Sequence, residues 1–216
     1  MFNSIFPKIH KEGYKFLAIS IITTFLVLLF SKFIGTFLIL ITIWVYYFFR
    51  DPERYSIADD DYLVSPADGL VTNISEQTGP LELQLENTTF TKVSIFMNVF
   101  NCHVNRTPLT GIVEEINYKP GKFLNASLDK ASEENERNFI TIKNAKGNEI
   151  VLTQIAGLVA RRIVCETKEK ENVKQGDRFG IIRFGSRVDL YFKNYEILVK
   201  KNQKTIGGET IIAKQN

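Results

Sequence analysis

A long apolar stretch lies near the start of the chain. Two runs, Phe16–Phe30 and Phe33–Phe49, are separated by Ser31-Lys32, and Lys32 is the only charged residue in the stretch. As helices the runs would be about 22 and 25 Å long, slightly short of the roughly 30 Å hydrocarbon core of a bilayer. The pattern predicts a membrane-associating helical hairpin within residues 1–50, either fully spanning or re-entrant.

A removable signal peptide and a buried core hairpin are the two other interpretations of this stretch. No small-residue cleavage site follows the first run, which argues against a removable signal peptide. A buried core hairpin of a soluble protein is the second alternative, but so long a segment with one charge would be unusual there. Trp44, Tyr46 and Tyr47 lie near one end of the stretch, where aromatic side chains favour a membrane interface.

Beyond the apolar stretch the pattern changes to short strands separated by turns. Asp51 precedes Pro52, and the residue before a proline is pushed away from helix. The pattern predicts an α+β fold, with one β-rich domain over residues 51–216 after the hydrophobic helical hairpin. Strands are expected at Leu63-Val64, Leu70–Ile74, Lys92–Phe96, Gly111–Tyr118, Phe139–Lys143, Glu149–Ile155 and Gly180–Phe184.

The connections between these strands are partly predictable. Ser65-Pro66-Ala67-Asp68-Gly69 has the composition of a turn, and Asn144–Asn148 is expected to join two strands of a hairpin. The polar segment Asp129–Arg137 fits a helical turn or a surface loop. Gly157–Cys165 fits either a strand or a helix, because its periodicity does not decide between them.

Charge along the chain is uneven. The net charge is +3, and five of the lysines and arginines fall within residues 1–50, which hold a single acid, Glu12. The basic excess therefore lies beside the apolar stretch, which argues against a nucleic-acid partner. Basic flanks favour the cytoplasmic side of a membrane, so we expect a cell-membrane protein whose main domain is cytoplasmic. Cys102 and Cys165 lack metal-site spacing, which agrees with a reducing compartment.

The candidate chemistry centres on Gly185-Ser186, which lies between two apolar, strand-like runs. Such a pair is able to cleave itself: the serine hydroxyl attacks the glycine carbonyl, and elimination from the resulting ester leaves a pyruvoyl group on the new N-terminus. An ordinary turn is the common alternative for this dipeptide.

A proton acceptor for this attack is available. His103 is the only histidine after residue 50, and imidazole suits general-base chemistry near neutral pH. Asp68 is a candidate to orient the ring by hydrogen bonding to its other nitrogen. The alternatives are a histidine satisfied by backbone groups and an aspartate that only forms its turn.

Six segments together resemble one family. They are Phe48–Arg54, Ser65–Gly69, Phe96–Pro108, Asp129–Asn138, Gln154–Arg162 and Gly180–Tyr191. In this order they are similar to the short prokaryotic (archaeal-type) form of the phosphatidylserine decarboxylase proenzymes. The resemblance implies that Ser186 becomes the pyruvoyl group and that Asp68, His103 and Ser186 form the self-cleavage set. Longer members have His-x-x-His where this chain has His103-Val-Asn-Arg106, and Gly-Ser-Thr where it has Gly-Ser-Arg.

The resemblance also implies the reaction. Phosphatidylserine in the membrane would form a Schiff base with the pyruvoyl group, lose carbon dioxide and leave as phosphatidylethanolamine, without a metal or pyridoxal phosphate. Cleavage after Gly185 would give a large chain, residues 1–185, and a small chain, residues 186–216, held together as a heterodimer; a higher oligomer is left open. The candidate contacts for the substrate's anionic groups are Arg106, Arg161 and Arg162, for which a solvated basic face is the alternative.

Two rival functions remain at this point. One is a membrane-anchored β-module without chemistry, such as a lipoyl-like or adaptor domain. The other is a serine hydrolase that uses Ser186, but residues 184–188 read Phe-Gly-Ser-Arg-Val and lack the Gly-x-Ser-x-Gly elbow. Both rivals predict an uncleaved chain.

Overall fold

The computed structural model describes residues 6–126, 134–158, 162–183 and 185–216. The chain divides into two compact units, Met1–Glu53 and Arg54–Asn216. Each unit is described by itself.

The first unit is a helical hairpin. Its elements are β1 (Lys8–Ile9), η1 (Lys11–Gly13), α2 (Tyr14–Phe30), α3 (Lys32–Phe48) and β2 (Arg50–Asp51). Ser31 ends α2 with an extended backbone (φ −145°), and its side chain accepts a hydrogen bond from the Ile34 amide at the start of α3. The β1 and β2 strands pair antiparallel, so both ends of the hairpin meet, opposite the turn at Ser31.

The two helices pack closely on each other. A Cβ at Gly35 would lie 2.4 Å from a methyl carbon of Leu28, and the Thr24 and Thr42 hydroxyl oxygens are 2.9 Å apart. Most apolar side chains of the hairpin are nevertheless exposed, among them Phe25 and Leu40, each at 62%. This exposure is not that of a buried core hairpin. By length and composition Lys11–Phe30 is able to cross a membrane, and Lys32–Phe48 is a shorter apolar helix.

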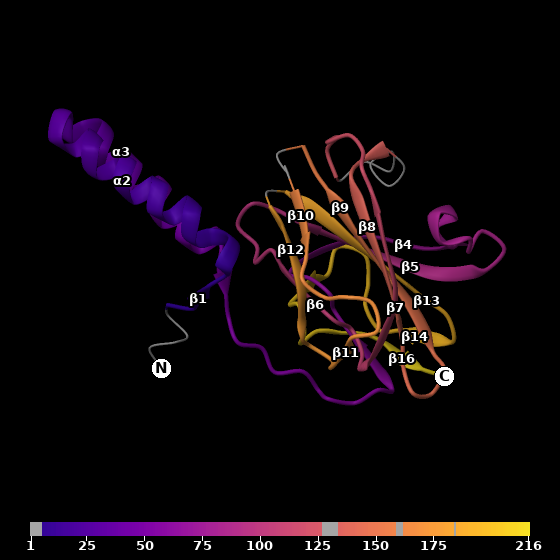
Figure 1. Cartoon of the computed structure of the whole chain (residues 1–216). Helices are drawn as coiled ribbons and strands as arrows, with labels where there is room; N and C mark the ends of the chain where they lie inside the picture. The colour runs from indigo at the N-terminus through magenta and orange to yellow at the C-terminus, as the bar shows by residue number, and fades with distance from the viewer. Residues whose placement is uncertain (1–5, 127–133, 159–161, 184) are drawn as a thin grey trace. The chain divides into compact units, whose positions relative to one another are not determined.

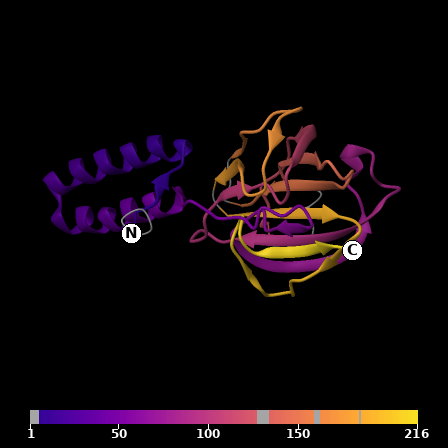
Figure 2. The same cartoon turned by 90° about the horizontal axis from the view of Figure 1, so that it is seen from below.

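The second unit is built from antiparallel strands (Figure 1). Its large sheet has eight strands in the order β11-β7-β8-β9-β13-β5-β4-β15, and two three-stranded sheets have the orders β10-β12-β6 and β14-β16-β3. Seen from below, the strands lie in more than one layer (Figure 2). The bounds are β3 (Tyr62–Val64), β4 (Gly69–Thr78), η2 (Leu81–Leu83), β5 (Thr89–Met97), β6 (Val104–Arg106), β7 (Gly111–Lys119), β8 (Arg137–Lys143), β9 (Glu149–Ala156), β10 (Arg162–Cys165), β11 (Asn172–Val173), β12 (Arg178–Arg183), β13 (Ser186–Phe192), β14 (Tyr195–Ile197), β15 (Lys204–Thr205) and β16 (Ile211–Gln215).

The main core lies on one face of the large sheet. Successive side chains of a strand point to opposite faces, and in β13 the inward positions are those of Val188, Leu190 and Phe192. Side chains of both small sheets belong to the same core, for example Ile182 of β12 and Ile212 of β16. The small sheets therefore cover the inner face of the large sheet.

The α+β, β-rich fold is confirmed, and each expected strand matches a strand of the structure. The Asn144–Asn148 connection is also confirmed: it joins β8 to β9, and Gly147 takes the φ of +83° that the turn requires. The Gly157–Cys165 segment contains a strand, β10, because its C-terminal part pairs with β12. The residues Val159–Arg161, Phe184 and most of the Asp129–Arg137 segment lie outside the described part of the chain.

Candidate active site

Ser186 is the first residue of the central strand β13. It pairs with Ala156 of β9 on one side and with Met97 of β5 on the other. The residue is fully buried, and by strand alternation its side chain shares the inner face with Val188. Within the described part of the chain, its Oγ has no hydrogen-bond partner. Because nearly all buried polar atoms are satisfied, this hydroxyl is an exception that calls for an explanation.

Gly185 has a backbone conformation that glycine adopts more readily than other residues do. Its φ is +54°, in the left-handed region. Residues that have a Cβ adopt this region only with an unfavourable conformational energy. Among the described residues other than its chain neighbours, no atom lies within 4 Å of the position that a Cβ would occupy. Glycine is therefore favoured here by the conformation of the backbone and not by a lack of space.

His103 is fully buried and directly precedes β6. Its Nδ1 lies 3.1 Å from the Asn101 carbonyl oxygen. Because a carbonyl only accepts hydrogen bonds, Nδ1 carries the proton in the neutral ring and Nε2 is the basic nitrogen. The His103 carbonyl accepts a hydrogen bond from the Ile182 amide, so the backbone at residue 103 lies beside the strand that leads to Gly185.

Asp68 makes an ion pair in the turn between β3 and β4. Its Oδ2 is 2.9 Å from Nη2 of Arg54, and both side chains are largely buried. Its Oδ1 accepts a hydrogen bond from the Gly207 amide at 2.8 Å. Arg54 and Gly207 thus contribute to orienting Asp68, and the Asn101 carbonyl contacts His103 Nδ1. An Asp68–His103 pair stays a prediction.

The predicted arginine contacts differ in their surroundings. Arg106 lies in β6, is 4% exposed and donates from Nη1 to the Gly176 carbonyl at 2.9 Å. Arg162, at the start of β10, is exposed and pairs across strands with Arg183. Arg161 lies outside the described residues. Of the two arginines in this set that the structure describes, Arg162 is therefore the one that a ligand could reach from solvent.

A chain of buried amides leads toward Ser186, and local sequence pattern alone does not reveal it. The Asn138 Nδ2 donates to Gln154 Oε1 at 3.0 Å, and Gln154 Nε2 donates to Asn105 Oδ1 at 2.8 Å. The Asn105 Nδ2 lies 3.6 Å from the sulfur of Met97, the cross-strand neighbour of Ser186. The sequence does contain one indication of this network: polar residues occupy inward-facing positions of strands that are otherwise apolar. In a low-dielectric interior such a satisfied network holds its members rigidly.

The Cys165 thiol of β10 is not an activated nucleophile. Burial raises the pKa of the Cys165 thiol, which keeps it protonated and unreactive near neutral pH. Among the described residues there is no group of three or more His, Cys, Asp or Glu side chains that could hold a metal ion.

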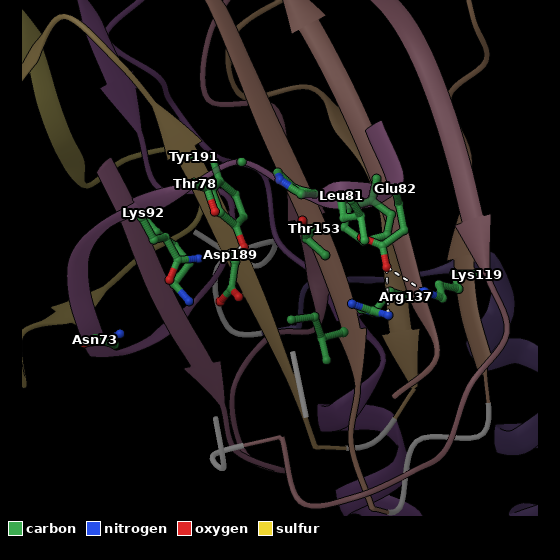
Figure 3. A pocket seen from close by; sticks show the side chains of 15 residues that line it. Asn73, Thr78, Leu81, Glu82, Lys92, Lys119, Arg137, Thr153, Asp189 and Tyr191 are labelled. Atoms are coloured by element: carbon green, nitrogen blue, oxygen red, sulfur yellow. Dashed lines mark hydrogen bonds and ion pairs between the residues drawn. The ribbon is translucent and has the colours of Figure 1, made fainter. Parts of the chain in front are cut away.

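A cavity of about 650 Å³ lies on the other face of the large sheet (Figure 3). Asp189 and Tyr191 of β13 line it, whereas Ser186 has the opposite orientation by strand alternation. Glu82 binds Lys119 and Arg137 at its wall, at 2.7 and 3.1 Å. The sheet itself therefore separates this cavity from Ser186.

Comparisons with known proteins agree on one family. The family model described as phosphatidylserine decarboxylase matches residues 41–213. A protein of Pelagibacter ubique (strain HTCC1062) named phosphatidylserine decarboxylase proenzyme is 63% identical over 215 residues, which is 100% of both chains. Proteins of the same name from Rickettsia typhi and Rickettsia prowazekii are 50% identical over 213 residues, covering 98% of this chain and 92% of theirs. The chain therefore belongs to the phosphatidylserine decarboxylase family.

Proposed function

We propose that this protein decarboxylates phosphatidylserine to phosphatidylethanolamine and carbon dioxide, and that it is a carboxy-lyase made as a self-cleaving proenzyme. Family membership over the whole chain supports the reaction. The observation that carries the self-cleavage is the Gly185-Ser186 junction: a buried serine hydroxyl without a described partner follows a glycine in the left-handed region.

Self-cleavage starts with attack by the Ser186 Oγ on the Gly185 carbonyl carbon. His103 Nε2 takes the hydroxyl proton, which passes to the Ser186 nitrogen as the carbon–nitrogen bond breaks, and an ester remains. Loss of the Ser186 α-proton expels the Gly185 carboxylate and leaves a dehydroalanine. Its tautomer takes up water and releases ammonia, which yields the pyruvoyl group.

The fold explains how the two chains stay together after cleavage. The new small chain would start with β13, which pairs with β9 on one side and β5 on the other. Its later strands β14 and β16 pair with each other, and β16 also pairs with β3. A heterodimer of residues 1–185 and 186–216 would therefore keep the pairings of β13 beyond residue 186 and those of the later strands.

A pyruvoyl group at position 186 would supply a ketone able to bind the substrate amine and to accept the electron pair released with carbon dioxide. The position fits a group formed from the serine itself, because the Ser186 Oγ is buried and has no hydrogen-bond partner among the described residues. His103 is the candidate to return a proton to the substrate carbon, and Arg162 the candidate to meet an anionic group of the lipid. Arg106 and Arg161 stay weaker proposals for that contact.

Turnover of the lipid tests the function. Vesicles containing phosphatidylserine labelled at the serine carboxyl should release labelled carbon dioxide when the purified protein is added. Cyanoborohydride added during turnover should attach the substrate amine to the small chain alone. A fully cleaved protein that releases no carbon dioxide from these vesicles would contradict the proposed reaction.

The hairpin explains how the enzyme reaches a lipid that stays in the bilayer. The basic residues Lys8, Lys11, Lys15 and Arg50 flank its open end, and the positive-inside rule then places that end on the cytoplasmic side. We therefore propose a cytoplasmic catalytic domain held at the cell membrane by residues 1–50.

Charged residues on the hairpin should detach the protein from membranes. In the double variant Phe25→Lys with Leu40→Lys, each lysine at the centre of a membrane helix raises the free energy of membrane insertion by about 2.5–3.5 kcal/mol. Co-sedimentation of this variant with vesicles should therefore be lost. Turnover of vesicle phosphatidylserine should fall at least about tenfold, while turnover of a short-chain soluble analogue stays. Phe25→Leu with Leu40→Phe is the matched control. Unchanged co-sedimentation of the lysine variant would refute the role of the hairpin.

A further inference from the structure

Gly157 lies directly against the carbonyl group at the cleavage junction. A Cβ at position 157 would be 1.9 Å from the Gly185 oxygen and 2.9 Å from the Gly185 carbonyl carbon. Since a carbon–carbon bond is about 1.5 Å long, the Gly157 Cα is no farther than about 3.4 Å from that oxygen. The obstacle to a side chain is backbone, so no rotamer change would relieve the clash.

The contact involves the atom on which charge develops. When the Ser186 Oγ adds to the Gly185 carbonyl, the carbonyl oxygen becomes an oxyanion. The same strand end positions both reactants, because Ala156 pairs with Ser186 while Gly157 touches the Gly185 oxygen. A Cα–H group at this distance is only a weak hydrogen-bond donor, so the effect is mainly one of orientation.

We propose that Gly157 is a positioning residue for self-cleavage. By lacking a side chain, it lets the end of β9 lie against the Gly185 carbonyl and turn its carbon toward the Ser186 Oγ. The inference rests on the proposed self-cleavage. It gives the two glycines separate tasks: Gly185 supplies the backbone conformation, and Gly157 supplies the close approach to the carbonyl group.

The chain contains a matched control for the steric change. A Cβ at Gly111 would lie 2.4 Å from the Lys143 carbonyl oxygen, where β7 pairs with β8. Gly111→Ala therefore creates a comparable clash with a backbone carbonyl, away from the cleavage junction. Leu158→Ala is a second control, because Leu158 adjoins Gly157 but is 69% exposed.

The test is a time course of cleavage for newly translated chains, with hydroxylamine added to capture any ester. Gly157→Ala should cleave roughly 100-fold more slowly, the size expected for a misplacement of about 1 Å, and should accumulate no hydroxylamine-sensitive ester. Gly111→Ala and Leu158→Ala should cleave at the rate of the unsubstituted chain. Equal slowing of Gly157→Ala and Gly111→Ala, or normal cleavage of Gly157→Ala, overturns the inference.

A second measurement does not depend on the folding of Gly157→Ala. A crystal structure of the uncleaved Ser186→Ala chain should show the Gly185 carbonyl oxygen against the Gly157 Cα; a carbonyl that points away overturns the inference. Failure of the unsubstituted chain to cleave has a different meaning, because it contradicts the proposed self-cleavage itself.

Discussion

Ser186→Ala should leave the chain at full length and abolish decarboxylation. The substitution removes the hydroxyl that attacks Gly185 and, with it, the only source of the pyruvoyl ketone. It also removes a buried polar atom that has no partner among the described residues, so we expect the fold to be as stable as before or more stable. Gel analysis of cleavage, carbon dioxide release and thermal unfolding measure the three effects.

A second buried serine provides the control for Ser186→Ala. Ser94 lies in the neighbouring strand β5, is 2% exposed and pairs across strands with Asp189. By strand alternation its side chain points to the opposite face from Ser186, so Ser94→Ala should cleave and turn over lipid normally. Decarboxylation by the Ser186→Ala chain would refute the assignment of the cofactor to this position.

His103→Gln should slow self-cleavage by roughly 10²–10⁴-fold, the range in which general bases contribute. Glutamine keeps much of the size and polarity of histidine but cannot accept the Ser186 proton. The rate of cleavage of newly made chains measures the effect. His10→Gln is the matched control, because His10 is the other histidine and belongs to the first unit.

The two outcomes for His103→Gln separate two roles. Slow cleavage supports its role as the base for maturation. Normal cleavage followed by loss of decarboxylation would contradict that role and leave His103 as a proton donor to the substrate carbon.

The orientation of the ring by the Asn101 carbonyl predicts further that Asp68→Asn changes the rate of self-cleavage less than His103→Gln does.

Local pattern was sufficient for the hairpin and for most of the large sheet. Apolar runs predicted α2 and α3, and alternating runs predicted strands such as β7 and β9, because each is encoded by neighbouring residues. Strands β14 and β15, of three and two residues, are too short to show such a pattern. Their pairing with β16 and β4 depends on contacts between distant segments. The same is true of β10, whose strand character is fixed by its partner β12.

The candidate site divides in the same way. Gly185-Ser186 and His103 could be picked out by residue type and by resemblance. The ion pair of Asp68 with Arg54, the amide chain from Asn138 to Asn105 and the approach of Gly157 to the scissile carbonyl could not. Each of these joins residues far apart in the sequence, or residues related only by strand register, so only the folded chain reveals them.

Intact-mass measurement of the purified, folded protein tests the central claim most directly. Two chains are expected: one with the mass of residues 1–185, and one with the mass of residues 186–216 reduced by the loss of ammonia from the N-terminal serine. A single full-length chain with an unmodified Ser186 would contradict it.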